Sequence, residues 1–263
     1  DMKIYLLIQD VINRCSRLHF KSIMLFFLFA LISIKANGQD IYKKYDSLRK
    51  LKPRKEHLKI ADSLFLLSKT TGDYHSLAKV SHEISVFYYS KKNLVKAIEY
   101  GLVEIENYEK INKKNSLYTK ALFNVGWFYN KNFEYDKAIR CYRKVIDLNY
   151  DKLKKAEAYC EIGRCYKRKG DYFKSVNFFK KGISLLKKNN SNKLLFGKYI
   201  NLAITYVNIN TKNSLKEALN VLDTAAKLLP TIKTSNRQYY ELNNGYLNVF
   251  SNEKSYNYKK AIY

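Results

Sequence analysis

A short phrase that recurs along the chain constrains its fold more than any other feature of the sequence. It reads KNLVKA at 92–97, FEYDKA at 133–138, GDYFKS at 170–175 and YNYKKA at 256–261, with a looser copy, NSLKEA, at 213–218. Each copy follows an amphipathic stretch that carries a tyrosine at a fixed place: Tyr88, Tyr129, Tyr166, Tyr206 and Tyr246. Self-similarity of this kind predicts an array of stacked repeats rather than one globular core.

The composition favours helices as the material of these repeats. Hydrophobic residues make up 46% of the 263 residues and charged residues 27%, so the chain can bury a core and is not disordered. It contains only two prolines and nine glycines, and so few helix breakers suit long helices better than many short strands.

The recurring residues alternate in size in a way that predicts packed helix pairs. Small residues at Gly126, Gly163 and Ala203 would let two antiparallel helices approach closely. Large residues, including most of the recurring tyrosines, would fill the space between them. One pair cannot bury its apolar face alone, so the pairs must stack.

The copies resemble the tetratricopeptide repeat, in which a first helix carries Leu-Gly-x-x-Tyr and a second carries Ala-x-x-x-Phe-x-x-Ala. The resemblance is carried by Val125-Gly126-x-x-Tyr129 with Ala138 and Tyr142, Ile162-Gly163-x-x-Tyr166 with Ser175 and Phe179, and Leu202-Ala203-x-x-Tyr206 with Ala218, Leu222 and Ala225. It covers nearly all of residues 40–263 and implies an all-α solenoid of antiparallel helix pairs forming a right-handed superhelix. The family period is about 34 residues, so copies 37 to 41 residues apart carry a few extra residues each.

The spacing predicts where the helix pairs begin and end. We expect pairs at 40–52/55–70, 76–90/93–111, 116–130/135–149, 152–169/172–188 and 193–208/214–229, with a last pair near 235–251 and from 256 on. The array would therefore occupy residues 39–263 with five to six pairs. The last pair is expected to be truncated, because little sequence follows Ala261.

The N-terminal residues 1–38 are predicted to be a leader and a signal peptide. Lys21 precedes the apolar run 22–34, and the small residues Ala36 and Gly38 favour cleavage before Gln39. The run is shorter than the roughly 20 residues that span a membrane. An uncleaved signal anchor is the alternative. Either way we expect an exported protein of the periplasm or cell envelope.

The charge and the resemblance together predict the function class. The formal net charge is +26, which favours acidic partners, although scattered lysines can also simply keep a surface solvated. We expect a non-enzymatic scaffold that binds a protein or peptide partner, which the charge argument predicts to be acidic. The alternative is the sensory portion of a membrane-anchored signalling regulator with a histidine-kinase or helix-turn-helix output outside this chain. Charge alone would also fit a nucleic-acid binder, but export argues against it.

In tetratricopeptide arrays the first helix of each repeat lines a concave groove, and this resemblance assigns the candidate binding residues. The inward positions are Lys120, Phe123, Asn124, Trp127, Asn130, Lys131, Arg164, Lys167, Arg168 and Asn201, with Lys79, His82, Tyr89 and Ile204 at equivalent positions. Trp127, the only tryptophan, could anchor a partner or pack on the preceding repeat. The Arg164, Lys167 and Arg168 cluster could hold carboxylates or be a solvated helix end.

No pattern for chemistry stands out. The four histidines have no metal-ligand spacing, and no phosphate loop or nucleophile elbow occurs, so we expect no catalytic residue, no metal and no cofactor. Glu104, Glu106 and Glu109 fall on what the pattern predicts to be a solvated helix face. The cysteines after the leader are Cys141, Cys160 and Cys165. We expect buried structural thiols, and a Cys141–Cys160 disulfide stays an open alternative.

Overall fold

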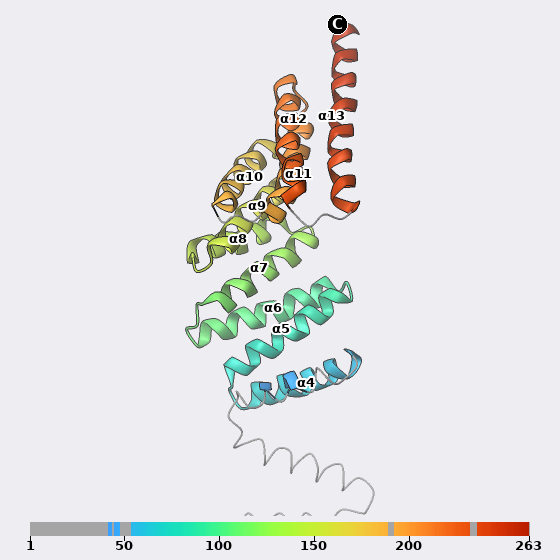
Figure 1. Cartoon of the computed structure of the whole chain (residues 1–263). Coiled ribbons are helices and arrows are strands. Elements are labelled where there is room, and N and C mark those ends of the chain that lie inside the picture. Colours follow the sequence, from blue (N-terminus) through green and yellow to red (C-terminus); the bar gives the residue numbers. More distant parts are fainter. Residues whose placement is uncertain (1–41, 44, 48–53, 189–191, 232–235, 263) are drawn as a thin grey trace, which may run out of the picture. The chain divides into compact units, whose positions relative to one another are not determined.

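The computed structural model describes residues 42–43, 45–47, 54–188, 192–231 and 236–262. The predicted signal peptide lies outside the described residues. Within these ranges every regular element is a helix, and no strand occurs (Figure 1). The chain divides into two compact units, Asp1–Val80 and Ser81–Tyr263, which we describe separately.

The N-terminal unit contains α4 (Arg54–Thr70) and the first turns of α5 (Tyr74–Ser90). The turn between the two helices is made by Gly72, whose φ of 69° suits glycine because it has no Cβ. The carboxylate of Asp73 then accepts a hydrogen bond from the backbone N–H of Ser76, 3.1 Å away, and so caps α5. Ala61, predicted as a small packing residue of α4, is buried.

The C-terminal unit is a series of antiparallel helices that follow one another without insertions. After the remainder of α5 come α6 (Leu94–Lys110), α7 (Ser116–Lys131), α8 (Tyr135–Leu148), α9 (Lys152–Arg168), α10 (Tyr172–Lys187), α11 (Asn192–Ile209), α12 (Lys212–Ala226), the 3₁₀ turn η1 (Leu229–Thr231) and α13 (Asn236–Ile262). From α6 to α12 each helix packs on the next, and the alternate helices α7, α9 and α11 also touch one another. The bounds of α6 to α12 agree with the predicted pairs to within three residues.

The turn inside each hairpin uses one residue in the left-handed conformation. These residues are Lys92, Phe133, Gly170 and Asn210, with φ values of 60°, 63°, 81° and 56°. In three of these four hairpins the second helix begins on a capping side chain, as where the Asp171 carboxylate accepts the N–H of Lys174. The remaining second helix, α8, has no side-chain cap. In α12 the cap is reciprocal, since Thr211 and Ser214 each bond the other's backbone N–H.

The recurring lysine of the repeated phrase lies over the recurring tyrosine eight residues before it. The Nζ atoms of Lys96, Lys137 and Lys174 lie 4.9, 5.4 and 5.5 Å from the ring centres of Tyr88, Tyr129 and Tyr166. Each pair joins the end of a first helix to the start of its second helix by a cation–π contact. This contact explains why lysine and tyrosine recur together in the sequence.

The predicted small residues lie where neighbouring helices cross. A Cβ added at Gly126 would lie 2.9 Å from Cε1 of Tyr142, and one at Gly163 would lie 3.1 Å from the ring of Phe179. Ala203 is 1% exposed. Close crossings are therefore present at Gly126 and Gly163, and Ala203 is buried. The small residues predicted on the second helices are also fully buried: Ala97, Ala138, Ser175 and Ala218.

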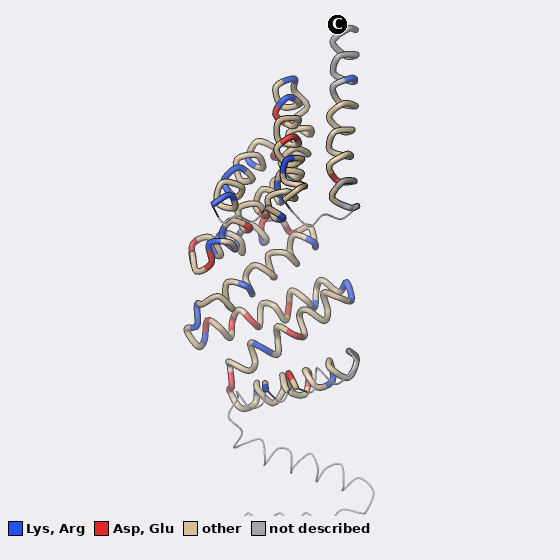
Figure 2. Tube along the Cα trace, viewed as in Figure 1, with Lys and Arg blue, Asp and Glu red and all other residues tan. Residues whose placement is uncertain are grey.

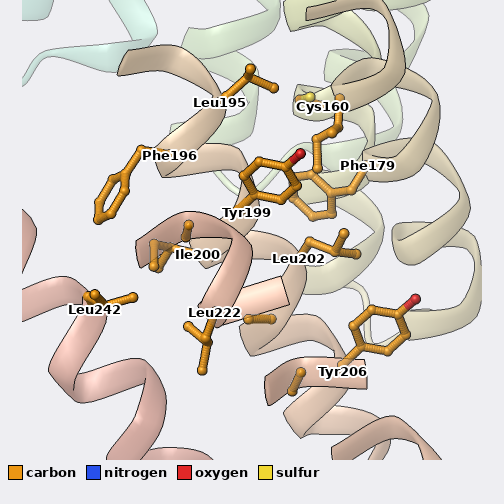
Figure 3. Packing of buried hydrophobic residues seen from close by; sticks show 14 of the residues in the cluster. Cys160, Phe179, Leu195, Phe196, Tyr199, Ile200, Leu202, Tyr206, Leu222 and Leu242 are labelled. Carbon is orange, nitrogen blue, oxygen red and sulfur yellow. The ribbon is translucent and has the colours of Figure 1, made fainter. Parts of the chain in front are cut away.

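A continuous hydrophobic core lies between α9, α10, α11, α12 and α13 (Figure 3). Phe179 of α10 and Leu222 of α12 are completely buried there, and Phe196 and Leu202 of α11 fill the space between them. Burying an aliphatic or aromatic side chain of this size contributes about 1.5–3 kcal/mol. This shared core supports the prediction that hairpins are stable only when stacked.

The expected break between the two C-terminal helices is wrong, because α13 is one continuous helix from Asn236 to Ile262. Residues 251–255 contain no glycine or proline. The side chains of Ser251 and Asn252 also bond to the carbonyls of Leu247 and Asn248, one turn earlier in the same helix. The phrase at 256–261 therefore lies within a helix and does not begin a new one.

Candidate functional site

The first helices of the C-terminal unit are joined by a chain of polar contacts that runs from α5 to α11. We call the side chains of α5, α7, α9 and α11 that take part in it the first-helix face. Trp127 of α7 donates from Nε1 to the hydroxyl of Tyr89 on α5, at 2.9 Å. On α9, the guanidinium carbon of Arg164 lies 5.4 Å from the Trp127 ring centre. The chain of contacts continues through Glu161 of α9 to Lys198 of α11.

The indole of Trp127 is held between two cations. Lys131 lies one helical turn further along α7, and its Nζ is 4.9 Å from the indole ring centre. Arg164 approaches the same ring from α9. Trp127 is only half-buried by this arrangement. It thus both packs within the array and keeps part of its surface free for a partner.

Glu161 is the buried acid at the centre of the face. Its Oε1 accepts from Nζ of Lys198 at 2.9 Å, and its Oε2 lies 3.2 Å from Nη1 of Arg164. The contact with Arg164 has no hydrogen-bond geometry, which leaves Oε2 without a hydrogen bond. Both Glu161 and Lys198 are buried, and the pair fixes α11 against α9. Removing one partner would leave an uncompensated charge inside the protein.

Two further contacts join neighbouring first helices. Arg168 of α9 donates from Nη1 to both the backbone carbonyl and Oδ1 of Asn130 on α7, at 2.9 Å in each case. Lys167 of α9 donates to Oδ1 of Asn201 on α11 at 3.0 Å. The Asn201 amide is oriented by its own bond to the carbonyl of Gly197. Four of the predicted residues are therefore brought together in pairs.

Positive charge is concentrated where these contacts meet. Burial, together with the neighbouring guanidinium groups of Arg164 and Arg168, lowers the pKa of Lys167 to about 8. Glu161 acts in the opposite direction, but more weakly. Burial is the larger cause, and the repulsion by the two guanidinium groups adds to it.

The remaining predicted residues lie towards the start of α7. Phe123 makes an edge contact with Tyr142, with ring centres 5.3 Å apart, and Nζ of Lys154 lies 4.6 Å from the Phe123 ring centre. Lys120 is exposed, and its charge is one of the influences that oppose the rise in the pKa of Glu104 caused by burial. Asn124 is half-buried and makes no hydrogen bond with any residue that the structure describes, so its amide is available to a ligand.

Sequence reasoning missed the roles of Glu161 and Lys198. Their pairing could have been expected, because Lys198 is the one charged residue between Leu194 and Val207, in an otherwise apolar stretch of a helix. A charge within such a stretch is stable in a fold only when it is paired.

The prediction that Glu104 lies on a solvated face is wrong. Glu104 is 4% exposed, and its Oε2 lies 3.0 Å from Nδ1 of His82. Burial raises the pKa of Glu104, and the hydrogen bond from His82 opposes this rise. Glu106 and Glu109 do lie on the exposed side, where Glu106 pairs with Lys110. All three acids are on α6 and differ in the side of the helix on which they lie. Glu104 lies on the side that contacts His82 of α5, whereas Glu106 and Glu109 lie on the exposed side.

The three cysteines after the leader are free thiols, so the Cys141–Cys160 disulfide is not formed. Burial raises the pKa of Cys141 to about 11, and those of Cys160 and Cys165 to about 12. These are structural, unreactive thiols, as predicted.

The described part of the chain contains neither a cluster of metal ligands nor a helix that could span a membrane. Among the described residues, no three histidine, cysteine or carboxylate side chains lie close enough together to bind a metal ion. Of the helices described, none combines the length and the hydropathy that a membrane crossing requires.

Comparison with known proteins identifies the repeats. The tetratricopeptide repeat family matches residues 119–152 and 156–189, which are the hairpins α7/α8 and α9/α10. Anaphase-promoting complex subunit CDC16 of Saccharomyces cerevisiae is 26% identical over 170 residues, which is 65% of this chain and 20% of that protein. The chain spans about a fifth of the length of the curated relatives it matches.

Solved structures agree on the fold. A kinesin light chain from Podosopora anserina with nearly identical TPR-like repeats has a TM-score of 0.58 at 14% identity, covering 75% of this chain and 97% of that chain. A signal-transduction ATPase with a tetratricopeptide repeat sensor from Pyrococcus horikoshii has a TM-score of 0.61 at 16% identity, covering 86% of this chain and 39% of that chain. The chain therefore contains tetratricopeptide repeats and folds as an all-α solenoid of that type. Proteins of this class bind proteins or peptides and are generally non-enzymatic.

Proposed function

We propose that this chain is a non-enzymatic scaffold of the cell envelope that binds an acidic segment of a partner protein along the first-helix face. The observation that carries the proposal is the excess of positive charge around Trp127. Lys131, Arg164, Lys167 and Arg168 lie on α7 and α9 in this region, and the nearby acid Glu161 is already shared between two cations.

The chemistry of the face fits a peptide that carries carboxylates. Arginine side chains offer paired N–H donors that match a carboxylate. The exposed part of the indole offers a flat apolar surface of the kind that anchors partners. The free amide of Asn124 can bond a peptide backbone through both its N–H and its carbonyl. A carboxylate arriving beside Lys167 would offset the repulsion from Arg164 and Arg168, which adds to the effect of burial on the pKa of Lys167.

The binding test compares two peptides of equal length, one alternating glutamate with leucine and one alternating lysine with leucine. We expect the acidic peptide to change the fluorescence of Trp127, the only tryptophan, and the basic peptide not to. Adding salt should weaken the acidic peptide's binding, because the contacts are charge pairs at a solvent-accessible surface.

Variants then assign the binding to this face. Trp127→Ala with Arg164→Glu should abolish capture of a labelled acidic peptide while the helical circular dichroism stays intact. Arg143→Glu is the matched control, because it makes the same charge change at an exposed site on α8. Equal loss of peptide capture in both variants would mean that net charge alone explains the binding. No loss of capture in either variant would mean that the peptide binds elsewhere on the protein.

The proposed location depends on the predicted signal peptide. Cell fractionation and N-terminal sequencing of the protein from its own cells test it, with Gln39 expected as the first residue. Recovery from the soluble cytosol with the leader intact would contradict export.

The proposal also holds that nucleic acid is not the partner. Filter binding of duplex DNA and of RNA across a range of salt concentrations should give no steep salt-dependent binding curve. A steep salt-dependent curve would instead favour a nucleic-acid binder, the alternative that charge alone suggests.

A further inference from the structure

The three most exposed large apolar side chains among the described residues lie at one edge of the C-terminal unit. They are Phe133 and Phe173, each 76% exposed, and Val95 at 69%. Each lies at or just after the turn inside a hairpin: α5/α6 for Val95, α7/α8 for Phe133 and α9/α10 for Phe173. We call these three turns, residues 90–96, 131–137 and 168–174, the turn edge.

The turns of this edge are neighbours in space. Nζ of Lys169, at the end of α9, pairs with Oδ1 of Asp136, at the start of α8, at 2.6 Å. This ion pair joins the α7/α8 turn to the α9/α10 turn. Figure 1 shows the α5/α6 and α7/α8 turns on the same side of the stack. The α7/α8 and α9/α10 turns are therefore adjacent, and the α5/α6 turn lies on the same side of the stack as the α7/α8 turn.

Phe133 occupies its position at a cost to the fold. Its φ is 63°, in the left-handed region, where the equivalent residues of the next two hairpins are Gly170 and Asn210. A side chain with a Cβ is strained in this region relative to a right-handed conformation. Glycine would remove both the strain and the exposed aromatic surface. A strained, exposed phenylalanine therefore indicates a role outside the folded chain.

The turn edge is also basic. Its three segments hold eight lysines and arginines and three acids. All three acids are already paired with lysines of the same edge: Glu134 with Lys137, Asp136 with Lys169 and Asp171 with Lys174. Among the described residues no carboxylate pairs with the other five basic side chains, which are Lys91, Lys92, Lys96, Lys131 and Arg168. Figure 2 shows lysines at the tip of the α5/α6 turn.

We propose that the turn edge binds the surface of an anionic lipid bilayer. Aromatic and apolar side chains at the tips of separate turns can each enter the interfacial layer, where phenylalanine is favourable. The lysines beside them that pair with no carboxylate can reach anionic headgroups. Separate tips can touch a flat surface together, and the net charge of +26 draws the whole chain towards an anionic one. The three apolar tips lie outside the first-helix face, which shares only Lys131 and Arg168 with the turn edge.

Vesicles of phosphatidylcholine containing a quarter of phosphatidylglycerol are the probe, with pure phosphatidylcholine for comparison. The full chain should sediment with the anionic vesicles. The variant Phe133→Gly with Phe173→Ser should bind at least tenfold more weakly and unfold at a higher urea concentration than Phe173→Ser alone. Tyr150→Ser, which removes an aromatic that is 60% exposed at the opposite α8/α9 turn, should bind as the wild type does.

A second measurement excludes binding through the predicted signal peptide, which is the same in every variant. Phe173→Trp and Tyr150→Trp each add a second indole, and brominated phosphatidylglycerol quenches an indole that enters the bilayer. The added fluorescence of Phe173→Trp should be quenched and that of Tyr150→Trp should not. Three results would each overturn the proposal in favour of a protein contact at this edge. They are equal quenching of both added indoles, unchanged vesicle binding by the Phe133→Gly, Phe173→Ser variant, and no preference for anionic vesicles.

Discussion

The indole N–H of Trp127 and the hydroxyl of Tyr89 form a 2.9 Å hydrogen bond across two first helices that are 38 residues apart in sequence. The ring of Tyr89 also packs on Phe128, with ring centres 5.0 Å apart. Tyr89 thus makes a polar contact with Trp127 and an apolar contact with Phe128, both on α7. The only tryptophan is therefore a built-in reporter of whether α5 and α7 are docked.

Tyr89→Phe removes the acceptor of this bond and keeps the ring. We expect a loss of about 1 kcal/mol in the free energy of unfolding, because a half-buried indole N–H recovers part of its bonding from water. Urea unfolding followed by Trp127 fluorescence measures it. Tyr150→Phe, on an exposed turn, is the matched control and should change nothing. A loss as small as that of the control would mean that the bond contributes no stability.

The glycines of α10 and α11 offer a matched pair for close packing. In Gly182→Ala the new Cβ would lie 2.3 Å from Sγ of Cys160 and 2.8 Å from the carbonyl oxygen of Ala156. Because backbone blocks relief, we expect destabilisation by about 1–3 kcal/mol or more. In Gly197→Ala no heavy atom lies within 4 Å, so the variant should gain up to about 1 kcal/mol from helix propensity.

The two glycine variants are compared by thermal unfolding under identical conditions. If Gly182→Ala raised the melting temperature, as Gly197→Ala is expected to do, the α9–α10 crossing would have more room than the structure gives it.

Lys167 should make stability depend on pH in the alkaline range. Its pKa of about 8 in the folded protein is below the usual value for lysine, so between these values the unfolded chain binds more protons than the folded one. The contribution of Lys167 therefore becomes more favourable to folding as pH rises through this window. Arg164, Arg168 and Glu161 act on Lys167 from its own helix, and the neutral Asn201 faces it from α11.

Lys167→Gln isolates this effect, because tyrosines and cysteines that titrate in the same range are common to both proteins. The free energy of unfolding of the wild type, measured against that of the variant, should rise between about pH 8 and pH 10. A difference that stays flat across this range would show that the lysine titrates normally.

The buried thiols should resist alkylation in the folded protein. Burial raises the pKa of Cys160 and of Cys165 to about 12, so almost no thiolate is present near neutral pH. Iodoacetamide labelling followed by mass spectrometry should modify these residues only in urea. Cys141, which is half-buried, should react first. Rapid labelling of Cys160 under native conditions would contradict the packing of α9 against α10.

The sequence by itself determined the repeat and its register. Three recurring features depend on contacts made within one hairpin. They are the small residues Gly126 and Gly163, the lysine that lies eight residues after a recurring tyrosine, and the turn residues. Such contacts join residues close in sequence, so their pattern is visible as a period. The limits of α6 to α12 could be predicted for the same reason. The missing turn in α13 was not predictable from the phrase alone, because helix capping and turn residues decide where a helix ends.

Only the tertiary structure decided which polar side chains meet. The bonds from Trp127 to Tyr89, from Arg168 to Asn130 and from Lys198 to Glu161 each span 37 or 38 residues, which is one repeat. Whether two such side chains touch depends on how far each first helix is rotated and shifted against the next, and that offset is set by packing of the whole hairpin. The burial of Glu104 was decided in the same way.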